Sequence, residues 1–393
     1  MNPSLLNGYF VAGLLVLVAL RNVAPRRIQT TVVLGGGPLL IALASFETFL
    51  VIGGSSVLVL FPLALGMRSV RRRGGERSAT RWLLIGGVVS LLTIWLLYRI
   101  CRDYDLPVLG ATYSARLAAA FGFSYFLFRA ISYLYMHHLV DLPERTPLPV
   151  LGYSLFPTTV TSGPIHLYGD FKRQSEHLAP LSLRMLGTAV FRVTQGFFYK
   201  ICLAAWLQAI VDRLLVVESP GVLVSLVEIA LLYLIFFFDF AGYSHIAIGF
   251  GLLLGVKVPE NFKRPFLATS ITEFWRNWHA TLAEWFRNHV FIPAGGMRSG
   301  RVKAGMLAAG IMLACGVWHG FTVPFLLWGL WHGGLLLFEA LGGTAPMPRR
   351  MRQGWAYWRR VFLTNAKVAL GALLFLPSFD AIGRVLGGFV RWL

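Results

Sequence analysis

The sequence predicts an all-α fold that crosses a membrane many times. Of its 393 residues, 56% are hydrophobic and 13% are charged, whereas soluble domains carry charges on about 25% of their residues. Apolar runs near the length of a membrane helix, about 20 residues, recur along the chain. Lysines and arginines gather in short clusters between those runs, as the positive-inside rule describes. We therefore expect roughly ten to twelve transmembrane helices, with some re-entrant or interfacial ones.

The expected apolar segments follow one another with no room for a soluble domain. They are 5–20, 29–46, 48–66, 81–99, 115–138, 147–165, 186–214, 221–238, 240–256, 304–318, 320–340, 361–376 and 378–393. This order predicts a single integral-membrane domain over residues 1–393. Arg21, Arg26 and Arg27 after the first segment predict an outside N-terminus and a cytoplasmic first loop. The first segment lacks the flanks of a cleaved signal peptide.

A net charge of +19 could indicate a nucleic-acid partner. The basic residues instead stand between apolar runs, for example in Arg68–Arg81 and Arg349–Arg360. We therefore expect no nucleic acid, but membrane lipid or an acidic protein on the cytoplasmic side. The three cysteines show no CxxC spacing, so neither a disulfide framework nor a thiolate metal site is expected.

Residues 257–303 are too polar to span a membrane as a simple helix. Ser270 or Thr272 is a candidate N-cap for a helix that starts near Ile271, with Glu273 in its first turn. Apolar residues then recur every three or four positions. They are Phe274, Trp278, Leu282 and Trp285. This spacing predicts one amphipathic helix at an interface or wedged into the protein.

Two Trp-His pairs, Trp278-His279 and Trp318-His319, are the strongest chemical signal. Histidine moves protons near neutral pH, and an ionisable group at membrane depth is costly and usually kept for function. His319 lies between apolar runs, so we interpret it as a general base, with a packing histidine as the alternative. His279 would share a helical face with Trp275 and Arg276 and is a base, a substrate-positioning group or an interfacial histidine.

Other histidines give weaker signals. His332, 13 residues after His319, is a cavity or packing residue, with packing favoured. His137-His138 followed by Asp141 is one residue short of an HHxxxD motif, and we interpret it as interfacial. No histidine has HExxH or other compact metal-ligand spacing, so we expect no metal site.

Two further features suggest a polar cavity. Asp239 is the single acid of the apolar run 229–256, and its partner would be backbone amides, Tyr243 or Ser244. Residues 156–167, which include Ser162 and Pro164, break an apolar segment with two prolines and a glycine. Such backbone is tolerated at membrane depth where protein or a water-filled cavity satisfies it, so this stretch is a candidate cavity wall.

The chain resembles the membrane-bound O-acyltransferase (MBOAT) family over roughly residues 120–335. The stretches that carry this resemblance are GFSYFLFR (122–129), FPTTVTSGPI (156–165), FFDFAGYSHIAIG (237–249), PENFKRPFLATSITEFWRNWHATLAEWFRNHVFIPAGG (259–296) and VWHGFTVPFLLWGLWHG (317–333). Within the family it is similar to the bacterial cell-envelope branch. SGPI and GFFYK (196–200) favour its D-alanyl transfer subgroup, whereas FIPAGG (291–296) favours the alginate O-acetyltransferases. His166 and Leu167 depart from the D-alanyl pattern.

The resemblance implies a ring of transmembrane helices around a thin centre, with a tunnel that joins the two faces. His319 matches the family's catalytic histidine, and His279 matches its second signature position. We expect neighbouring residues to line the substrate path. They are Trp275, Arg276, Asn277, Trp278, Trp318, Ser162, Pro164, Asp239 and His332.

The expected reaction moves an acyl group from a cytoplasmic thioester to a hydroxyl of an extracytoplasmic envelope polymer. D-alanyl is the preferred acyl group, and acetyl, as in polysaccharide O-acetyltransferases of the alginate type, is the alternative. His319 would take the hydroxyl proton, and His279 would position the thioester or polarise its carbonyl. The donor is phosphopantetheine on an acyl carrier protein, or acetyl-CoA, and no cofactor is bound permanently. An extracytoplasmic transferase could complete the transfer. The bacterial cytoplasmic membrane is the expected location, and a transporter without chemistry is the alternative.

Overall fold

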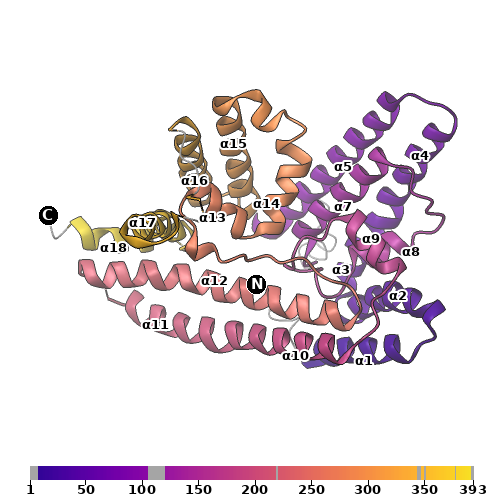
Figure 1. The fold of residues 1–393 in the computed structure, drawn as a ribbon, viewed down its shortest axis with the longest axis horizontal. Coiled ribbons are helices and arrows are strands. Elements are labelled where there is room, and N and C mark those ends of the chain that lie inside the picture. Colours follow the sequence, from indigo (N-terminus) through magenta and orange to yellow (C-terminus); the bar gives the residue numbers. More distant parts are fainter. Residues whose placement is uncertain are drawn as a thin grey trace. The chain divides into compact units, whose positions relative to one another are not determined.

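A computed structural model describes residues 8–104, 120–217, 220–342, 347–348, 351–376 and 378–390. The chain divides into two compact units (Figure 1). The first takes Met1–Val193 and Ile246–Pro259, and the second takes Thr194–His245 and Glu260–Leu393. Every regular element in the described ranges is helical, apart from one isolated bridge between Phe262 and Trp278. That residues 1–393 form a single integral-membrane domain stays a prediction.

Helices long and apolar enough to cross a membrane confirm the expected class, a multi-pass all-α membrane protein. Six of them occur in the described part of the chain: Arg26–Ala44, Phe46–Arg72, Arg77–Tyr104, Val222–Leu253, Arg301–His319 and Val323–Leu341. Each offers at least the ~18 residues that a span needs. The total of ten to twelve helices, the ring and the tunnel stay predictions, and residues 115–119 of one expected segment lie outside the described ranges.

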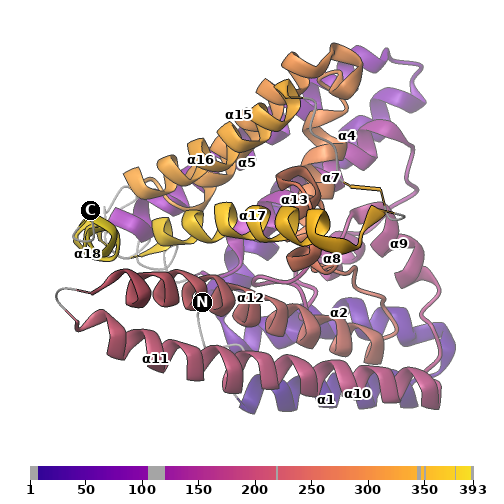
Figure 2. The ribbon, with the colours of Figure 1, turned by 60° about the vertical axis from the view of Figure 1, so that its left-hand side comes forward.

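The first unit is built from helices that pack pairwise. They are α1 (Gly8–Val23), α2 (Arg26–Ala44), α4 (Phe61–Arg72), α5 (Arg77–Tyr104), α7 (Phe123–Leu139), α8 (Leu148–Ser154) and α9 (Tyr168–Glu176). Two π-helical stretches, Phe49–Gly53 and Ser56–Leu60, precede α4. Helices α4, α5 and α7 lie side by side in both ribbon views (Figures 1 and 2).

The segment 147–165 is not a spanning helix, as expected from the prolines and glycine that break it. Only α8 is helical, and the prolines and glycine turn the chain after it. The buried Arg129 donates to Tyr153 O at 3.2 Å and to Thr159 Oγ1 at 3.4 Å. Gly122, at φ +74°, lets α7 begin against the carbonyl of Val160. Arg129 thus satisfies a backbone carbonyl at the end of α8 from within the protein, as irregular backbone in an apolar setting requires.

Helix α12 (Val222–Leu253) is one continuous helix, although two segments, 221–238 and 240–256, were expected. Asp239 lies in its middle and pairs with Lys200, so the acid does not interrupt the helix. Lys200 lies in the π-helical stretch Phe198–Ala204, between α10 (Leu183–Phe197) and α11 (Ala205–Leu215). Gly242 of α12 permits the close approach, because a Cβ there would lie 2.8 Å from Gly196 O.

The second unit also holds α13 (Ile271–Asn277), α14 (Ala280–Phe286), α15 (Arg301–His319), α16 (Val323–Leu341), α17 (Gly354–Ala372) and α18 (Phe379–Val390). Helices α15 and α16 pack side by side (Figure 2). Gly316 and Gly329 face each other across this contact, and a Cβ on Gly329 would lie 2.8 Å from Leu313 Cα. Small residues allow such close helix packing in membranes. This contact fixes the end of α15, where His319 lies.

Candidate functional site

His279 lies at a break between two short helices, not on one continuous helix. Helix α13 ends at Asn277, Trp278 is extended, and His279 adopts the left-handed conformation at φ 47° before α14 starts. This corrects the expected amphipathic helix: residues 274, 278, 282 and 285 do not form one helical face. His279 therefore does not share a helical face with Trp275 and Arg276 either.

The start of α13 is fixed by polar contacts from two directions. The Ser270 hydroxyl accepts from Glu273 N at 3.1 Å, which confirms one of the two expected N-caps. The carboxylate of Glu339, on α16, accepts from Ile271 N at 2.6 Å and from Thr272 N at 2.9 Å. A carboxylate at a helix N-terminus satisfies free N–H groups. Glu339 thereby joins the helix that leads to His279 to the helix that follows His319.

Asn261 holds the break itself in place. Its backbone oxygen accepts from Ala280 N at 2.9 Å, and its Oδ1 accepts from the Thr281 hydroxyl at 2.8 Å. Its amide nitrogen donates to Ser244 Oγ, on α12, at 3.2 Å. Asn261 is fully buried. Because the left-handed region is unfavourable for most residues other than glycine, these contacts account for the conformation of His279.

His319 is the last residue of α15, and its half-buried ring lies among aromatic rings. Its ring centroid is 5.2 Å from those of Trp328 and Phe375, 5.7 Å from Phe325 and 4.9 Å from Trp318. Aromatic walls lower the local dielectric and strengthen polar interactions of the imidazole. The ring is therefore neither sealed in the core nor open on all sides.

His332 and Trp275 extend this aromatic group into the interior of the second unit. The His332 ring lies 4.9 Å from Trp275 and 4.9 Å from Trp328, which also contacts His319. Gly371 of α17 gives it room, because a Cβ there would collide with His332 Nε2. Within the described residues, neither His332 Nδ1 nor Trp275 Nε1 has a hydrogen-bond partner, and both are buried. Two such atoms side by side suit a polar ligand.

Burial controls the charge of His279. The side chain is 7% exposed, and burial, followed by the charge of His319, lowers its pKa to about 3. His279 and His319 are thus close enough to interact electrostatically. A histidine with this pKa is neutral at physiological pH, and a neutral imidazole can donate one hydrogen bond while it accepts another.

Asp239 forms an ion pair with Lys200, which corrects the expected partners, backbone amides, Tyr243 or Ser244. Lys200 is a lone cation in an apolar stretch, and this is the signal in the sequence that points to a partner for a membrane acid. Asn261 and Glu339 were not singled out. Only the folded chain reveals them, since both act across long sequence distances.

The other residues that were expected to line the substrate path have different surroundings. Trp278 packs against Phe274, Tyr233 and Phe262, at ring distances of 5.4, 5.9 and 5.1 Å. This contact set is typical of a packing residue. Arg276 is exposed, and Asn277 and Trp318 are partly buried. Ser162 and Pro164 belong to the first unit. Their part in a substrate path stays a prediction.

No cluster of three His, Cys, Asp or Glu side chains suited to a metal ion occurs where the structure describes the chain. The second unit therefore brings together His279, His319, His332 and Trp275, but no recognisable ligand set.

Comparison with known proteins finds a family model and several relatives that match this chain. The family model described as MBOAT, membrane-bound O-acyltransferase family, matches residues 91–376. A probable alginate O-acetylase of Pseudomonas fluorescens is 31% identical over 340 residues, which cover 84% of this chain and 64% of that protein. A teichoic acid D-alanyltransferase of Streptococcus thermophilus is 31% identical over 297 residues, 68% of this chain and 70% of that protein.

A shorter match covers less of both chains. A peptidoglycan O-acetyltransferase of Helicobacter pylori is 41% identical over 97 residues, which are 25% of this chain and 18% of that protein. The chain spans slightly less than two thirds of the length of the alginate relatives that it matches.

Proposed function

Because this chain belongs to the membrane-bound O-acyltransferase family, we propose that it transfers an acyl group from a cytoplasmic thioester to a hydroxyl of an extracytoplasmic envelope polymer. The single observation that carries the proposal is the pair of histidines in the second unit. His319 is half-buried at the end of a membrane-spanning helix, and His279 lies within its electrostatic reach. Names of relatives that act on envelope polymers support this choice of acceptor.

His319 acts as the general base in this proposal. A hydroxyl oxygen forms a bond to the thioester carbonyl carbon while His319 accepts the hydroxyl proton. The carbon–sulfur bond then breaks, and the leaving thiolate takes that proton back from His319. A base in this role contributes about 10²–10⁴-fold to the rate, and alignment of the two substrates adds more.

His279 positions the thioester and polarises its carbonyl. With a pKa of about 3 it is a weak base, so proton abstraction does not suit it. A neutral ring on a rigid backbone can instead donate a hydrogen bond to the oxygen that gains negative charge. The contacts of Asn261 supply the rigidity. Trp275 and His332 offer further polar atoms to the substrate.

The acyl group is D-alanyl or acetyl. SGPI and GFFYK support D-alanyl, which comes from phosphopantetheine on an acyl carrier protein. FIPAGG and the 84% coverage by an alginate relative support acetyl, which comes from acetyl-CoA or another thioester. The basic loops suit an acidic carrier. The bacterial cytoplasmic membrane is the proposed location, and an extracytoplasmic transferase is a further proposed partner.

Reconstitution with defined donors tests this function. The purified protein in liposomes is supplied with acetyl-CoA or with a D-alanyl carrier protein, and with an envelope polysaccharide or teichoic acid. Mass spectrometry then detects an ester on the acceptor. We expect an acyl mass increase with one donor and none without protein. An acceptor that moves across the membrane covalently unchanged would identify a transporter and reject the proposal.

A further inference from the structure

A pocket of about 490 Å³ lies in the first unit, apart from the residues of the proposed reaction. Its lining includes two arginines, a histidine and two apolar side chains. These residues are Arg71, Arg77, His138, Leu139 and Val140, together with the acid Asp141. The pocket therefore combines cationic groups with an apolar edge.

The pocket lies where two membrane-spanning helices meet their connecting turn. The span Phe46–Arg72 ends beside it, and the span Arg77–Tyr104 begins beside it. Residues at such ends lie at the depth of lipid headgroups. Arg77 is also the first residue of α5, whose free N–H groups favour an anion.

Hydrogen bonds fix the wall that α7 contributes. Arg71 Nη2 donates to the backbone oxygens of His137 and His138, at 3.1 and 2.8 Å. The Thr80 hydroxyl lies 3.0 Å from His138 Nδ1. Helices α4 and α5 are thus both tied to the C-terminal end of α7.

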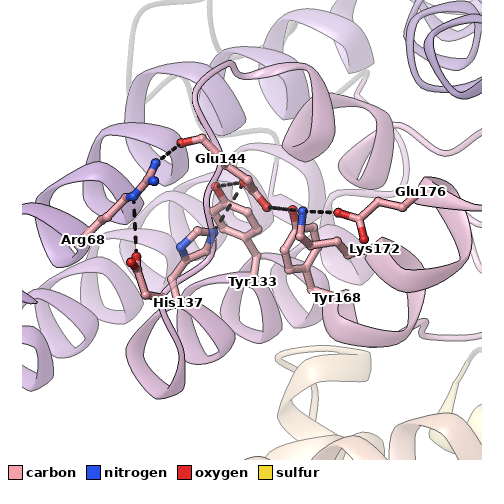
Figure 3. Close-up of polar contacts among 8 residues, drawn as sticks. Arg68, Tyr133, His137, Glu144, Tyr168, Lys172 and Glu176 are labelled. Atoms are coloured by element: carbon pink, nitrogen blue, oxygen red, sulfur yellow. Dashed lines mark hydrogen bonds and ion pairs between the residues drawn. The ribbon is translucent and has the colours of Figure 1, made fainter. Parts of the chain in front are cut away.

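A buried acid, Glu144, holds the segment that follows α7 (Figure 3). Figure 3 shows its carboxylate enclosed by side chains from α7 and α9. Tyr133 donates to it at 3.0 Å, the Tyr168 hydroxyl also donates to it, and His137 Nε2 lies 3.5 Å away. Lys172 Nζ is 3.9 Å from the same carboxylate. The side chain of His137 is buried against Glu144, and its position at the membrane interface stays a prediction.

The charge balance of the pocket favours an anion. Arg71, Arg77 and Arg81 all act electrostatically on His138. The acid in the lining, Asp141, is already paired: Arg68 Nε lies 3.5 Å from its carboxylate. Arg68 also donates to Glu144 O at 2.9 Å. Arginine is the side chain best shaped to bind a phosphate.

The apolar edge decides between a lipid and a free phosphate. Leu139 and Val140 line the pocket and are 43% and 40% exposed, and Trp82, five residues along α5 from Arg77, is 71% exposed. A phospholipid presents a phosphate and acyl chains together, whereas a soluble phosphate offers nothing to these side chains. Exposed tryptophan is typical of the membrane interface.

We propose that this pocket binds the phosphate of an anionic phospholipid, with Arg71 and Arg77 at the phosphate and Leu139 and Val140 against the start of the acyl chains. Basic pockets between membrane helices are known to hold such headgroups. The Glu144 cluster keeps the pocket open in the absence of lipid, because it fixes the segment that forms one wall.

The test compares R77Q with R73Q. Arg73 is exposed, lies in the same turn and does not line the pocket, so R73Q removes the same charge from the same loop. R77Q removes a cation from a helix N-terminus, which does not weaken the helix. Wild type and both variants are purified in detergent, and binding of phosphatidylglycerol and phosphatidylcholine is measured by native mass spectrometry, with melting temperatures as a folding check.

We expect wild type and R73Q to bind phosphatidylglycerol in preference to phosphatidylcholine, and R77Q to bind it about tenfold more weakly. Equal binding by all three proteins would overturn the proposal. Displacement of phosphatidylglycerol by millimolar inorganic phosphate alone would assign the pocket to a soluble phosphate and overturn the lipid assignment.

Discussion

His279 and His319 are held in different ways, and this difference suggests different roles. His279 is buried in the left-handed conformation that Asn261 supports. His319 ends a membrane-spanning helix and is partly open. A fixed, neutral imidazole suits hydrogen bonding to a carbonyl, whereas a base must exchange its proton with a mobile substrate.

Replacement of His279 by asparagine separates its role from folding. Asparagine tolerates the left-handed conformation, so H279N should melt within a few degrees of wild type. Its shorter amide does not reach the carbonyl, and the transfer rate should fall about 10²-fold. Transfer rates in liposomes and melting temperatures check this. The control H177N alters an exposed histidine of the first unit and should leave transfer unchanged. Wild-type transfer by H279N would exclude the proposed role.

At the scale of single residues, the sequence predicts contacts between neighbours in the chain but not contacts between distant residues. The Ser270 cap was predictable, because cap and first turn are adjacent in the chain. The partner of Asp239 was not, because Lys200 is 39 residues away. The sequence drew attention to His279 through its Trp-His pair, but neither its burial nor its left-handed backbone, which the contacts of Asn261 support, could be predicted from its neighbours in sequence.

Close packing of α15 against α16 positions the end of α15. A Cβ at Gly329 would lie 2.8 Å from Leu313 Cα, whereas a Cβ at Gly334 would have nothing within 4 Å. Both glycines lie inside α16, so alanine improves helix propensity by about 0.5–1 kcal/mol at either position. The steric cost arises only at residue 329.

We therefore expect G329A to lower the melting temperature and G334A to preserve or raise it. The cost at Gly329 should be about 1–3 kcal/mol, as for other overpacked sites. Thermal unfolding in detergent measures both variants. If G329A were as stable as G334A, the close helix contact described here would be wrong. Transfer should fall with G329A, since a displaced α15 moves His319.

Helices could be predicted where the length and the periodicity of an apolar segment determine them. Five of the six spans lie over expected apolar segments in simple order, whereas α12 joins two expected segments across Asp239, whose carboxylate pairs with Lys200. In the region 271–286, a regular apolar spacing predicted one helix, but the structure has two. Asn261, which is distant in sequence, holds the break between them.

Buried neutral histidines in both units make the stability of the whole molecule depend on pH. Burial lowers the pKa of His279 to about 3, and burial, followed by Arg129, lowers that of His166 to about 4. In the unfolded chain both pKa values are near 6.5. Below pH 6.5 the unfolded state binds more protons than the folded state, so stability falls as the pH is lowered towards the folded pKa values.

The melting temperature should accordingly decrease between pH 6.5 and 4.5. H166Q removes one of these proton-binding groups, so its melting temperature should decrease less over this pH range than that of wild type. Scanning fluorimetry across this pH range, with wild type and H166Q in the same detergent, measures the difference. An identical pH dependence for the two proteins would show that His166 does not resist protonation in the folded state.

The central claim is that His319 is the base for acyl transfer, and the most direct test is the acyl transfer rate of H319A. The variant is reconstituted in liposomes with the donor that wild type accepts, and the ester on the acceptor is quantified by mass spectrometry. We predict a rate about 10²–10⁴-fold below wild type, with a melting temperature close to that of wild type. Transfer by folded H319A at the wild-type rate would contradict the account.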